Sequence, residues 1–485
     1  MMKQPNWLLH RAYLTPERVA LIYQDKKWTF RDLADEVNEL SNRLAQTSLK
    51  KGEAVGLLMN NHPQMVMLVH ACFSLGFKIV LLNNKLTKAE RRFQLEDAKV
   101  VALFTEPDYA SDHKGELPVY TIETLPEACQ ENVKKIESDF DLNETATIMY
   151  TSGTTGRPKG VEQTFGNHFH SAVSSALNMG LREDDRWLIA LPLFHISGLS
   201  ALFKSVIYGM TIVLHQKFDV DEVKDSIEQH RVTMISAVQT MLSRLLSRLE
   251  ECPSSLRCLL LGGRSPLAML QESKEKGFPV FQSYGMTETC SQIVTLAPEF
   301  SVEKLGSAGK PLFGCELKIQ DGTRICRPFE HGDIMVKGAN VMKGYLYREE
   351  ATAAAFDQGW LKTGDIGYVD EEGFLFVLDR RSDLIISGGE NIYPAEIEAV
   401  LLTHPHVKEA GVTGIYDDRW GEVPAAFLVT DHKISENELY ALCESHLAKY
   451  KWPAAFHFVD ELPRNASNKL QRHRLKSKGF LDDSN

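Results

Sequence analysis

The most informative stretch of the chain is Tyr150-Thr151-Ser152-Gly153-Thr154-Thr155-Gly156-Arg157-Pro158-Lys159-Gly160. Its glycines allow backbone N–H groups to approach an anion, its hydroxyl groups add donors, and its two cations add positive charge. This mixture is typical of a loop that wraps around phosphates. A Walker loop has the order G-x-x-x-x-G-K-[ST], which the stretch does not match when read from Gly153. The sequence therefore predicts a phosphate loop of another kind, with a surface turn as the alternative.

The flanks of this loop predict a strand before it and a helix after it. Leu142 to Tyr150 ends in a β-prone run, and apolar residues at three- and four-residue spacing favour a helix from Val161 to Asn178. A strand, a glycine-rich loop and a helix in this order are a usual setting for phosphate recognition.

Short β-prone runs alternate with helical segments on both sides of the loop. The expected strands are Ala54–Met59, Ile79–Leu82, Val100–Phe104, Trp187–Ala190, Thr211–Leu214, Met234–Ala237, Arg257–Leu261 and Val280–Ser283. The expected helices are Ala34–Ala45, Pro63–Gly76, Lys88–Ala98, Val220–His230 and Thr240–Glu250. This alternation predicts an α/β fold with layers around largely parallel sheets.

The character of the chain changes after about Leu317. Short runs separated by turns predict a small β subdomain up to the charged cluster Asp379–Asp383, and an α+β unit follows it. We therefore expect a large N-terminal domain of layered α/β subdomains plus the β subdomain over residues 1–381. A small α+β C-terminal domain is expected over residues 382–485.

Composition excludes several classes of protein. The 485 residues carry a net charge of −11, which argues against a nucleic-acid binder. The eight cysteines form no C-x-x-C pair, so we expect thiols in a reducing compartment. Met1 to Arg11 lacks the apolar core of a signal peptide, and charged or helix-breaking residues interrupt the apolar stretch Trp187–Leu214. We expect a cytoplasmic protein without an integral membrane segment, and a homo-oligomer is compatible with the sequence.

Other motifs far from the loop carry groups that suit a nucleotide. In Gln282–Thr289, Tyr284 can stack on a base, Thr287 can donate to a phosphate and Glu288 can hold Mg²⁺. The alternative is a tight turn with a buried tyrosine. Asp365 follows a predicted turn and can accept hydrogen bonds from both hydroxyls of a ribose, or it is an ordinary turn residue.

Two further loops lie nearer the C-terminus. Ser387-Gly388-Gly389-Glu390-Asn391 allows a close approach of the backbone to a ligand, or is a hairpin turn. Lys469 lies in a polar loop, Leu462 to Arg472, and is either a reactive cation or a solvated side chain.

Together these motifs resemble the acyl-adenylate-forming superfamily, which contains acyl-CoA synthetases, peptide-synthetase adenylation domains and luciferases. The resemblance runs from Pro16–Leu21 to the lysine loop, with the motifs in the family's order. Three stretches, Leu191–Leu199, Phe281–Gln292 and Asp379–Pro394, look most like a subfamily, the o-succinylbenzoate–CoA ligases of menaquinone biosynthesis.

The resemblance implies two half-reactions that use ATP, Mg²⁺ and coenzyme A. A carboxylate attacks the α-phosphorus of ATP and expels pyrophosphate, and the thiolate of coenzyme A then attacks the acyl-adenylate and expels AMP. The C-terminal domain is expected to be mobile and to rotate between the two steps, with a hinge in Asp379–Asp383.

The resemblance also implies a role for each matching residue. Catalysis falls to Lys469, His195 and Thr287, and the metal ligand is Glu288. The nucleotide and coenzyme A contacts are Thr151, Ser152, Gly153, Thr154, Thr155, Gly156, Lys159, Gly262, Gly263, Tyr284, Gly285, Thr287, Asp365, Arg380, Gly388, Gly389 and Lys469. The acid contacts are His195, Ser197, Lys204, Thr289 and Ser291. We expect Lys204 to pair with the carboxylate of o-succinylbenzoate that does not react, or else to extend from an apolar helix to water.

The chain departs from the family's pattern at three positions. Ser382 stands at the hinge where relatives often carry Asp or Lys, and Asn468 precedes the lysine where many have Gly. Arg264 follows the glycine pair where small residues are common, and we assign it no role. The alternatives are a CoA ligase for another aryl or fatty acid, and a non-catalytic nucleotide-binding module.

Overall fold

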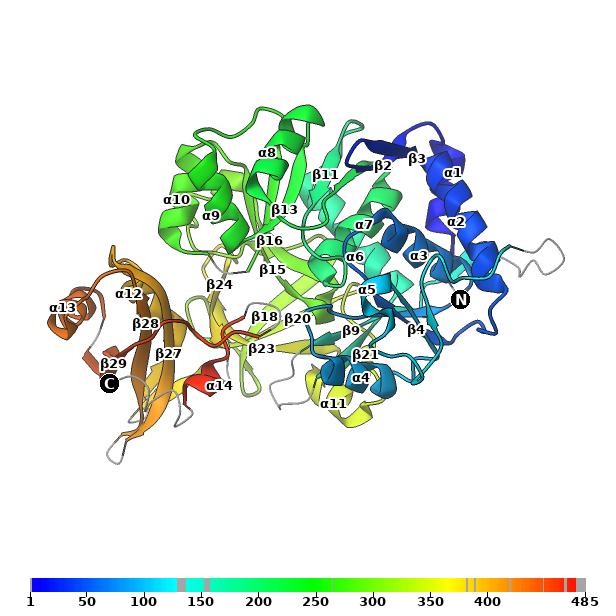
Figure 1. Ribbon diagram of the computed structural model, residues 1–485. Coiled ribbons are helices and arrows are strands. Elements are labelled where there is room, and N and C mark those ends of the chain that lie inside the picture. The colour runs from blue at the N-terminus through cyan, green and yellow to red at the C-terminus, as the bar shows by residue number, and fades with distance from the viewer. Residues whose placement is uncertain are drawn as a thin grey trace. The chain divides into compact units, whose positions relative to one another are not determined.

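Figure 1 shows the computed structural model of the chain. The structure describes residues 2–128, 137–151, 158–263, 265–380, 383–387, 390–417, 420–447, 449–465 and 469–476. The chain divides into two compact units, Met1–Leu317 with Val336–Leu361 and Lys318–Met335 with Lys362–Asn485. They are called the large unit and the C-terminal unit below. The division at residues 381 and 382 stays a prediction, since it concerns which part of the chain moves as a body.

One sheet of the large unit, the β14 sheet, carries most of the parallel strands. Its order is β17 (Lys310–Pro311), β16 (Ser291–Leu296), β15 (Val280–Met286), β14 (Cys258–Gly262), β13 (Met234–Val238), β11 (Arg186–Ile189), β12 (Thr211–Leu214), β2 (Val19–Tyr23) and β3 (Lys26–Thr29). The strands from β15 to β2 pair in parallel, and β16, β17 and β3 join through antiparallel pairs. The short helices η1 (Thr287–Thr289) and η2 (Pro298–Phe300) follow β15 and β16.

The second sheet of the large unit, the β4 sheet, contains the two strands beside the predicted phosphate loop. Its order is β21 (Gly344–Tyr345), β10 (Lys159–Thr164), β9 (Thr145–Thr151), β5 (Lys78–Leu81), β4 (Ala54–Leu58), β6 (Ala102–Thr105) and β7 (Val119–Tyr120). A separate pair is formed by β1 (Lys3–Pro5) and β8 (Asp139–Asp141).

Helices separate and cover the two sheets (Figure 1). Between the sheets lie α1 (Trp7–Leu14), α2 (Phe30–Ala45), α3 (Pro63–Ser74), α6 (Phe165–Met179) and α7 (Ile196–Tyr208). The outer face of the β14 sheet is covered by α8 (Val220–Gln229), α9 (Gln239–Arg248) and α10 (Leu267–Glu275). The outer face of the β4 sheet is covered by α4 (Lys88–Asp97) and α5 (Pro107–Ala110), and α11 (Glu349–Ala355) follows β21. The predicted α/β layering is confirmed, with element ends shifted by a few residues.

The layers follow from the alternation of side chains along each strand. On β5 and just beyond it, Ile79 and Leu81 face the core between the sheets, whereas Val80 and Leu82 face the outer core. Successive side chains of a strand point to opposite faces, so an unbroken apolar run can bury both faces of a parallel sheet.

The predicted helix from Val161 is wrong in its first turn, because β10 extends to Thr164 and α6 begins after it. The hydroxyl of Thr164 accepts from the Asn167 backbone N–H at 3.0 Å, and Asn167 Oδ1 accepts from the Thr164 N–H at 2.9 Å. This reciprocal cap fixes the start of the helix. Apolar spacing alone does not separate the short buried strand from the helix that follows it.

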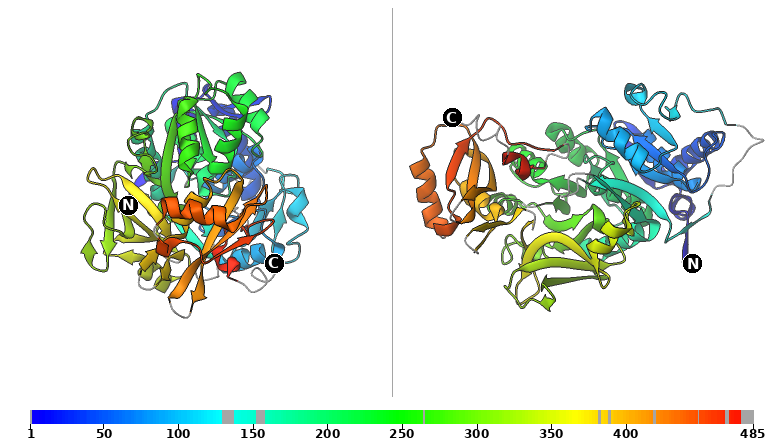
Figure 2. Two further views of the ribbon diagram at one scale, coloured as in Figure 1. Left: turned by 90° about the vertical axis from the view of Figure 1, so that its left-hand side faces the viewer. Right: turned by 90° about the horizontal axis from the view of Figure 1, so that it is seen from below.

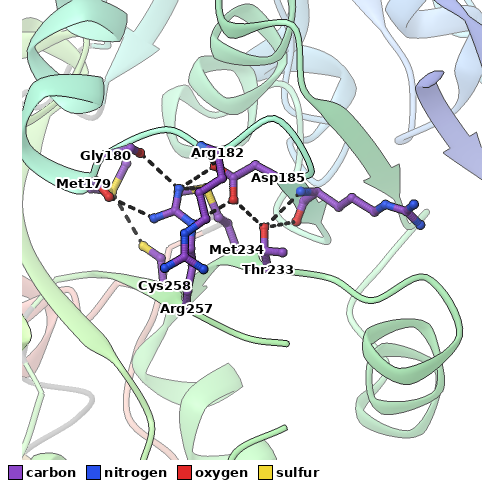
Figure 3. Close-up of polar contacts among 9 residues, drawn as sticks. Met179, Gly180, Arg182, Asp185, Thr233, Met234, Arg257 and Cys258 are labelled. Atoms are coloured by element: carbon purple, nitrogen blue, oxygen red, sulfur yellow. Dashed lines mark hydrogen bonds and ion pairs between the residues drawn. The ribbon is translucent and has the colours of Figure 1, made fainter. Parts of the chain in front are cut away.

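A buried ion pair fastens the amino ends of the β14-sheet strands (Figure 3). Arg257 precedes β14 and donates to Asp185 Oδ1 at 2.7 Å, and Asp185 precedes β11. The Thr233 hydroxyl, beside β13, donates to the same carboxylate at 2.9 Å. The guanidinium also donates to the carbonyls of Met179 and Gly180, at 2.9 and 3.0 Å. The carboxyl ends of these strands therefore stay together at the opposite edge of the sheet.

The C-terminal unit contains an α+β region built on the long pair β27 (Val407–Asp417) and β28 (Gly421–Thr430). The sheet order is β26 (Glu390–Ile392), β25 (Ile385–Ser387), β28, β27, and β29 (Ala455–Phe458) pairs with β28. Helices α12 (Pro394–Leu401) and α13 (Glu436–His446) pack on one face, as Figure 2 shows for the orange helix α13, and the short helices η4 (Lys449–Lys451) and α14 (Arg472–Leu475) follow. Ala426 and Leu428 face these helices, whereas Ala425 and Phe427 face Leu475 on the other side.

An antiparallel sheet corresponds to the predicted small β subdomain. Its order is β19 (Arg324–Ile325), β18 (Cys315–Asp321), β20 (Gly332–Gly338), β23 (Trp360–Val369) and β22 (Phe356–Asp357), and β24 (Leu375–Arg380) pairs with β23. Strands β18, β20 and β23 each have residues in both units.

Candidate active site

The carboxyl ends of β13 and β14, with β15 beside them, line a cavity in the large unit. Its lining residues are Leu191, Ile196, Ser197, Ser236, Ala237, Val238, Leu260, Gly262, Gly263, Ser283, Gly285, Ser291 and Gln292. The structure therefore brings together five of the predicted contacts, namely Ser197, Gly262, Gly263, Gly285 and Ser291. The carboxyl edge of an open α/β sheet is where such folds bind ligands.

The two glycines at the end of β14 leave open space beside the backbone. Gly263 has φ +83°, and a Cβ added there would meet no atom within 4 Å. At Gly262 the nearest atom to such a Cβ is the Ala237 carbonyl oxygen at 3.9 Å. A planar group can therefore come close to the main chain at this edge, which fits the predicted adenine position.

A strained turn opposite these glycines holds Gly285 and Ser291 against each other. A Cβ at Gly285 would lie 2.0 Å from the Ser291 carbonyl oxygen, so only glycine fits. Cys290 and Ser291 have φ +51° and +94°, which is the left-handed region that side chains avoid. The register of β15 and β16 shifts between Tyr284 and Gly285. Backbone strain of this kind persists where surrounding structure enforces it, and it concentrates at functional sites.

The next turn, η1, carries Thr287 and Glu288 on a backbone whose carbonyl groups are held in place. The Gln163 side chain donates to the Thr287 carbonyl at 2.6 Å, and the Met342 N–H donates to the Glu288 carbonyl at 2.8 Å. The Asn340 amide donates to the last carbonyl of η1 at 3.0 Å. The hydroxyl of Thr287 and the carboxylate of Glu288 therefore extend from a fixed support.

Tyr345 links the predicted metal ligand to the end of the predicted phosphate loop. Its hydroxyl donates to Glu288 Oε1 at 3.1 Å, and Lys159 Nζ lies 5.0 Å from the centre of its ring. Lys159 pairs with Thr151 across the β9–β10 hairpin, so both ends of the loop meet here. A half-buried carboxylate beside a lysine fits a magnesium–triphosphate group, because carboxylate oxygen suits Mg²⁺ and the ammonium suits phosphate. The predicted contacts Ser152, Gly153, Thr154, Thr155 and Gly156 lie outside the described residues.

Two further predicted acid contacts are Thr289 and His195. Thr289 is fully buried, and its hydroxyl donates to the Ser291 carbonyl at 2.7 Å. His195 occupies the N-cap position of α7, with its ring edge-on to Phe194 at 4.8 Å. Neither is one of the described residues that line the cavity.

Lys204 is a cation in the core of the large unit. It is 1 % exposed, and its Nζ lies 3.4 Å from Gln292 Oε1 and 5.3 Å from the centre of the Trp187 ring. Burial lowers the pKa of this ammonium to about 8. No ion pair joins Lys204 to a carboxylate of the described residues, although a buried charge is costly unless it is paired.

Gln292 lines the cavity and also contacts Lys204. The lysine charge is therefore separated from the cavity by one side chain. Its Nε2 donates to Thr295 Oγ1 at 3.1 Å, which fixes the amide. Sequence reasoning missed Gln292 and Tyr345. A buried glutamine within the β-prone run Ser291–Leu296 was a usable signal, whereas nothing near Tyr345 marked it.

The predicted ribose contacts lie directly opposite each other in the C-terminal unit. Asp365 on β23 pairs with Arg380 on β24, and Asp365 is 6 % exposed. The predicted turn directly before Asp365 is wrong, because Trp360–Val369 forms one strand, and the Asp365 N–H donates to Thr363 Oγ1 at 3.1 Å within it. The side chain of Arg380 lies outside the described residues.

The lysine loop is closed at its base, and Lys469 is exposed. The Lys469 N–H donates to Asn465 Oδ1, and the Asn465 N–H donates to the Lys469 carbonyl, both at 2.9 Å. Ser387 ends β25, which pairs with β26 as a hairpin, and Gly388 and Gly389 lie outside the described residues. The positions of Ser382, Asn468 and Arg264 also lie outside them.

Residues 8–346 match the family model described as AMP-binding enzyme, and residues 396–469 match the model described as AMP-binding enzyme C-terminal domain. The chain therefore belongs to the AMP-binding enzyme family, and the predicted membership of the acyl-adenylate-forming superfamily is confirmed.

Within this family, the chain is highly similar to ligases from Bacillus species. The chain is 96 % identical to a 2-succinylbenzoate–CoA ligase of Bacillus pumilus, with 100 % of both chains covered. It is 60 % identical to o-succinylbenzoate CoA synthetase from Bacillus subtilis in complex with the acyl-adenylate intermediate OSB-AMP, with a TM-score of 0.95 and 98 % and 99 % of the chains covered. A structure of the same enzyme with ATP and magnesium ion gives the same identity and TM-score, with 98 % and 100 % covered.

No helix within the described ranges has both the length and the apolar character needed to cross a membrane.

Proposed function

We propose that the protein is an AMP-forming acid–CoA ligase that acts on o-succinylbenzoate in menaquinone biosynthesis. It activates the acid as an acyl-adenylate with release of pyrophosphate, and then transfers the acyl group to coenzyme A with release of AMP. The observation that carries the proposal is the 96 % identity, over the whole chain, to a 2-succinylbenzoate–CoA ligase. The cavity at the glycine edge and the buried Lys204 behind it supply the physical support.

The first half-reaction brings an anion to a polyanion, so positioning and charge neutralisation are its main needs. Magnesium ion, brought by ATP, supplies charge neutralisation at the phosphates. Glu288 is suited to hold that ion and Lys159 to hold the phosphates, because both meet at Tyr345. Thr287 contacts the α-phosphate from the fixed turn η1.

The nucleoside is held by stacking and by the ribose pair. Tyr284 stacks on adenine, with the backbone of Gly262 and Gly263 on the other side of the base. Asp365 accepts hydrogen bonds from the ribose hydroxyls, and Arg380, opposite it on β24, supports the same contact.

Lys469 bridges the attacking carboxylate and the α-phosphate oxygens, where negative charge builds up in the transition state. The same lysine would block the thiol in the second half-reaction, so the C-terminal domain rotates between the steps. Gly388 and Gly389 then line the path of the coenzyme A arm, and His195 lies where the thiol and the acid meet.

The acid pocket is suited to a substrate with a second carboxylate. o-Succinylbenzoate keeps one carboxylate unreacted, and Lys204 offers the missing counter-charge through Gln292 or a water molecule. Ser197 and Ser291 line the cavity beside this route, and Thr289 shapes the turn that carries Ser291. A fatty acid would need an apolar tunnel without a buried cation, so Lys204 favours the dicarboxylate. The reaction draws on ATP and coenzyme A, and we place it in the cytoplasm.

Acid-dependent AMP release tests this function. The purified protein is incubated with ATP, Mg²⁺, coenzyme A and one member of an acid panel: o-succinylbenzoate, benzoate, cinnamate or a fatty acid. We expect AMP rather than ADP, with the highest kcat/KM for o-succinylbenzoate. Preference for another acid would overturn the substrate, and ATP binding without AMP release would favour a nucleotide-binding module.

A further inference from the structure

A second buried cation, Arg472, lies among three carboxylates in the C-terminal unit. Its Nε and Nη2 donate to the two oxygens of Glu398, at 3.1 and 2.7 Å. Its Nη1 donates to Asp383 Oδ2 at 2.9 Å and lies 3.9 Å from Asp379 Oδ1. The Arg472 side chain is 17 % exposed, and those of Glu398 and Asp379 are 12 % and 5 % exposed. Contacts of this bidentate, charge-assisted kind fix the orientation of both partners.

Among the described side chains, the cluster consists of one guanidinium and three carboxylates. Burial raises the pKa of Glu398, although the Arg472 guanidinium opposes this shift. Burial by itself would lower the pKa of Arg472, but Glu398, Asp379 and Asp383 together raise it. Two carboxylates have additional donors, since Glu398 Oε1 accepts from the Val412 N–H and Asp379 Oδ2 accepts from the Ala395 N–H, both at 2.8 Å. Arg472 is therefore the shared cation of three anions that come from separate segments.

The segments that meet at Arg472 are the predicted hinge, α12 and the end of the lysine loop, and the proposed reaction needs the hinge and this loop to act together. Asp379 and Asp383 bound the predicted hinge, and Glu398 belongs to α12. Arg472 follows Lys469 by three residues and comes directly after the closing contact of the lysine loop, where the Gln471 N–H donates to the Pro463 carbonyl at 2.8 Å. One side chain thus connects the base of the lysine loop to both sides of the hinge.

We propose that Arg472 is a positioning residue that holds Lys469 in register with the hinge, so that the lysine reaches the α-phosphate only when the hinge is in its adenylation setting. This inference rests on the proposed function. It differs from a purely structural role because it predicts a loss in one half-reaction and not in the other.

The test compares three variants with a matched control. Arg472→Lys keeps the charge but loses the bidentate contact, and Arg472→Met with Glu398→Gln removes the bidentate pair together, so that Glu398 is not left as a buried charge without its cation. Asp383→Asn cuts only the hinge side of the cluster. Arg474→Met is the control, since Arg474 lies on the same helix and is exposed.

Each variant is assayed for pyrophosphate release from o-succinylbenzoate and ATP, and separately for thioester formation from pre-made acyl-adenylate. We expect the double variant to lower kcat for adenylation by about a hundredfold, the loss that a displacement of about 1 Å in a reacting group can cause, with KM for ATP little changed. Arg472→Lys and Asp383→Asn should lose less, and thioester formation should stay within about twofold in all of them.

The decisive measurement is whether the effects of the Arg472 and Lys469 substitutions on adenylation are additive. When Lys469→Ala is already present, the Arg472→Met/Glu398→Gln change should lower adenylation by less than about twofold, since residues that act as a unit are not additive. An equal loss in both half-reactions, or additive losses, would overturn the proposal while the ligase function stands. Absence of acid-dependent AMP in the unchanged protein would instead overturn the function itself.

Discussion

Arg257 in the large unit and Arg472 in the C-terminal unit are both largely buried, with 13 % and 17 % of their side chains exposed, yet their surroundings differ. Arg257 faces one carboxylate and two main-chain carbonyls, all at the amino ends of neighbouring strands (Figure 3). Arg472 faces three carboxylates from the predicted hinge and from α12. A balanced pair within one sheet edge stabilises the fold, whereas a cation shared by several segments also sets their relative positions. Arg257 therefore belongs to the fixed frame of one sheet, whereas Arg472 lies in the part of the chain that we propose to move between the half-reactions.

The largest expected effect is that of Lys469→Ala, which sets the upper limit for any loss that Arg472 variants cause through the lysine. Adenylation should fall by about a thousandfold, the upper end for removing one donor from a charged transition state. Thioester formation from pre-made acyl-adenylate should be largely intact. The two half-reactions are measured separately. An equal loss in both would mean that Lys469 is structural.

Arg257→Met should destabilise the β14 sheet. Burial would raise the pKa of Asp185, but hydrogen bonds from Arg257, Arg182 and Thr233 lower it, so removing Arg257 leaves a buried carboxylate without its cation. We expect a loss of about 3–5 kcal/mol in the free energy of unfolding, measured by urea denaturation. Activity per folded molecule should be unchanged.

The matched control for this loss is Arg248→Met, which removes an ion pair with Asp221 whose two side chains are each 57 % exposed. It should cost less than about 1 kcal/mol. A similar loss in both variants would show that the Arg257 pair has no special weight in the fold.

Lys204→Met tests whether this buried cation binds the substrate, in contrast to Arg257 and Arg472, which bind carboxylates of the protein. KM for o-succinylbenzoate should rise by about ten- to a hundredfold, the range of a hydrogen bond to a charged group, and KM for ATP should stay within about twofold. Steady-state kinetics with Lys217→Met, an exposed lysine, as control would check this. Equal effects on both substrates would contradict the assignment.

The smallest effect expected is a change of kcat/KM with pH. Because burial lowers the pKa of Lys204 to about 8, the ammonium is lost above that pH in the free enzyme. The kcat/KM for o-succinylbenzoate should then fall above about pH 8 towards the value of Lys204→Met, and the variant itself should show no such fall.

The lowered pKa of Lys204 also makes the free energy of unfolding depend on pH. The folded-state pKa lies below the usual value of 10.5, so the unfolded chain binds the proton more tightly between about 8 and 10.5. The charged lysine therefore costs stability below that window, and the cost is relieved as pH rises through it. Stability curves that are parallel for the unchanged protein and Lys204→Met would contradict this.

The layers of the large unit were predictable because their strands are apolar on both faces and alternate with helices that have clear ends. The family and the activity were predictable because the glycine loop, the Tyr284–Glu288 turn and the lysine loop carry unusual residues in a fixed order. The strand at Lys159–Thr164 was not predictable from apolar spacing. The cap formed by Thr164 and Asn167 fixes the start of α6 after this strand, although the apolar spacing favours an earlier start.

What the sequence could not supply are contacts between segments that are distant in the chain. Tyr345 reaches Glu288 across 57 positions, and Arg472 reaches Asp383 across 89. Neither residue has a local pattern that marks it, because its importance comes from the partner that the fold brings to it.

Withholding coenzyme A separates the two half-reactions and tests directly whether an acyl-adenylate is formed first. The protein is mixed with o-succinylbenzoate, ATP and Mg²⁺, the bound products are identified by mass, and coenzyme A is then added. We expect an enzyme-bound acyl-adenylate with one pyrophosphate released, which reacts to AMP and the acyl thioester when coenzyme A is added. Release of ADP, or no acyl-adenylate before coenzyme A is added, would contradict it.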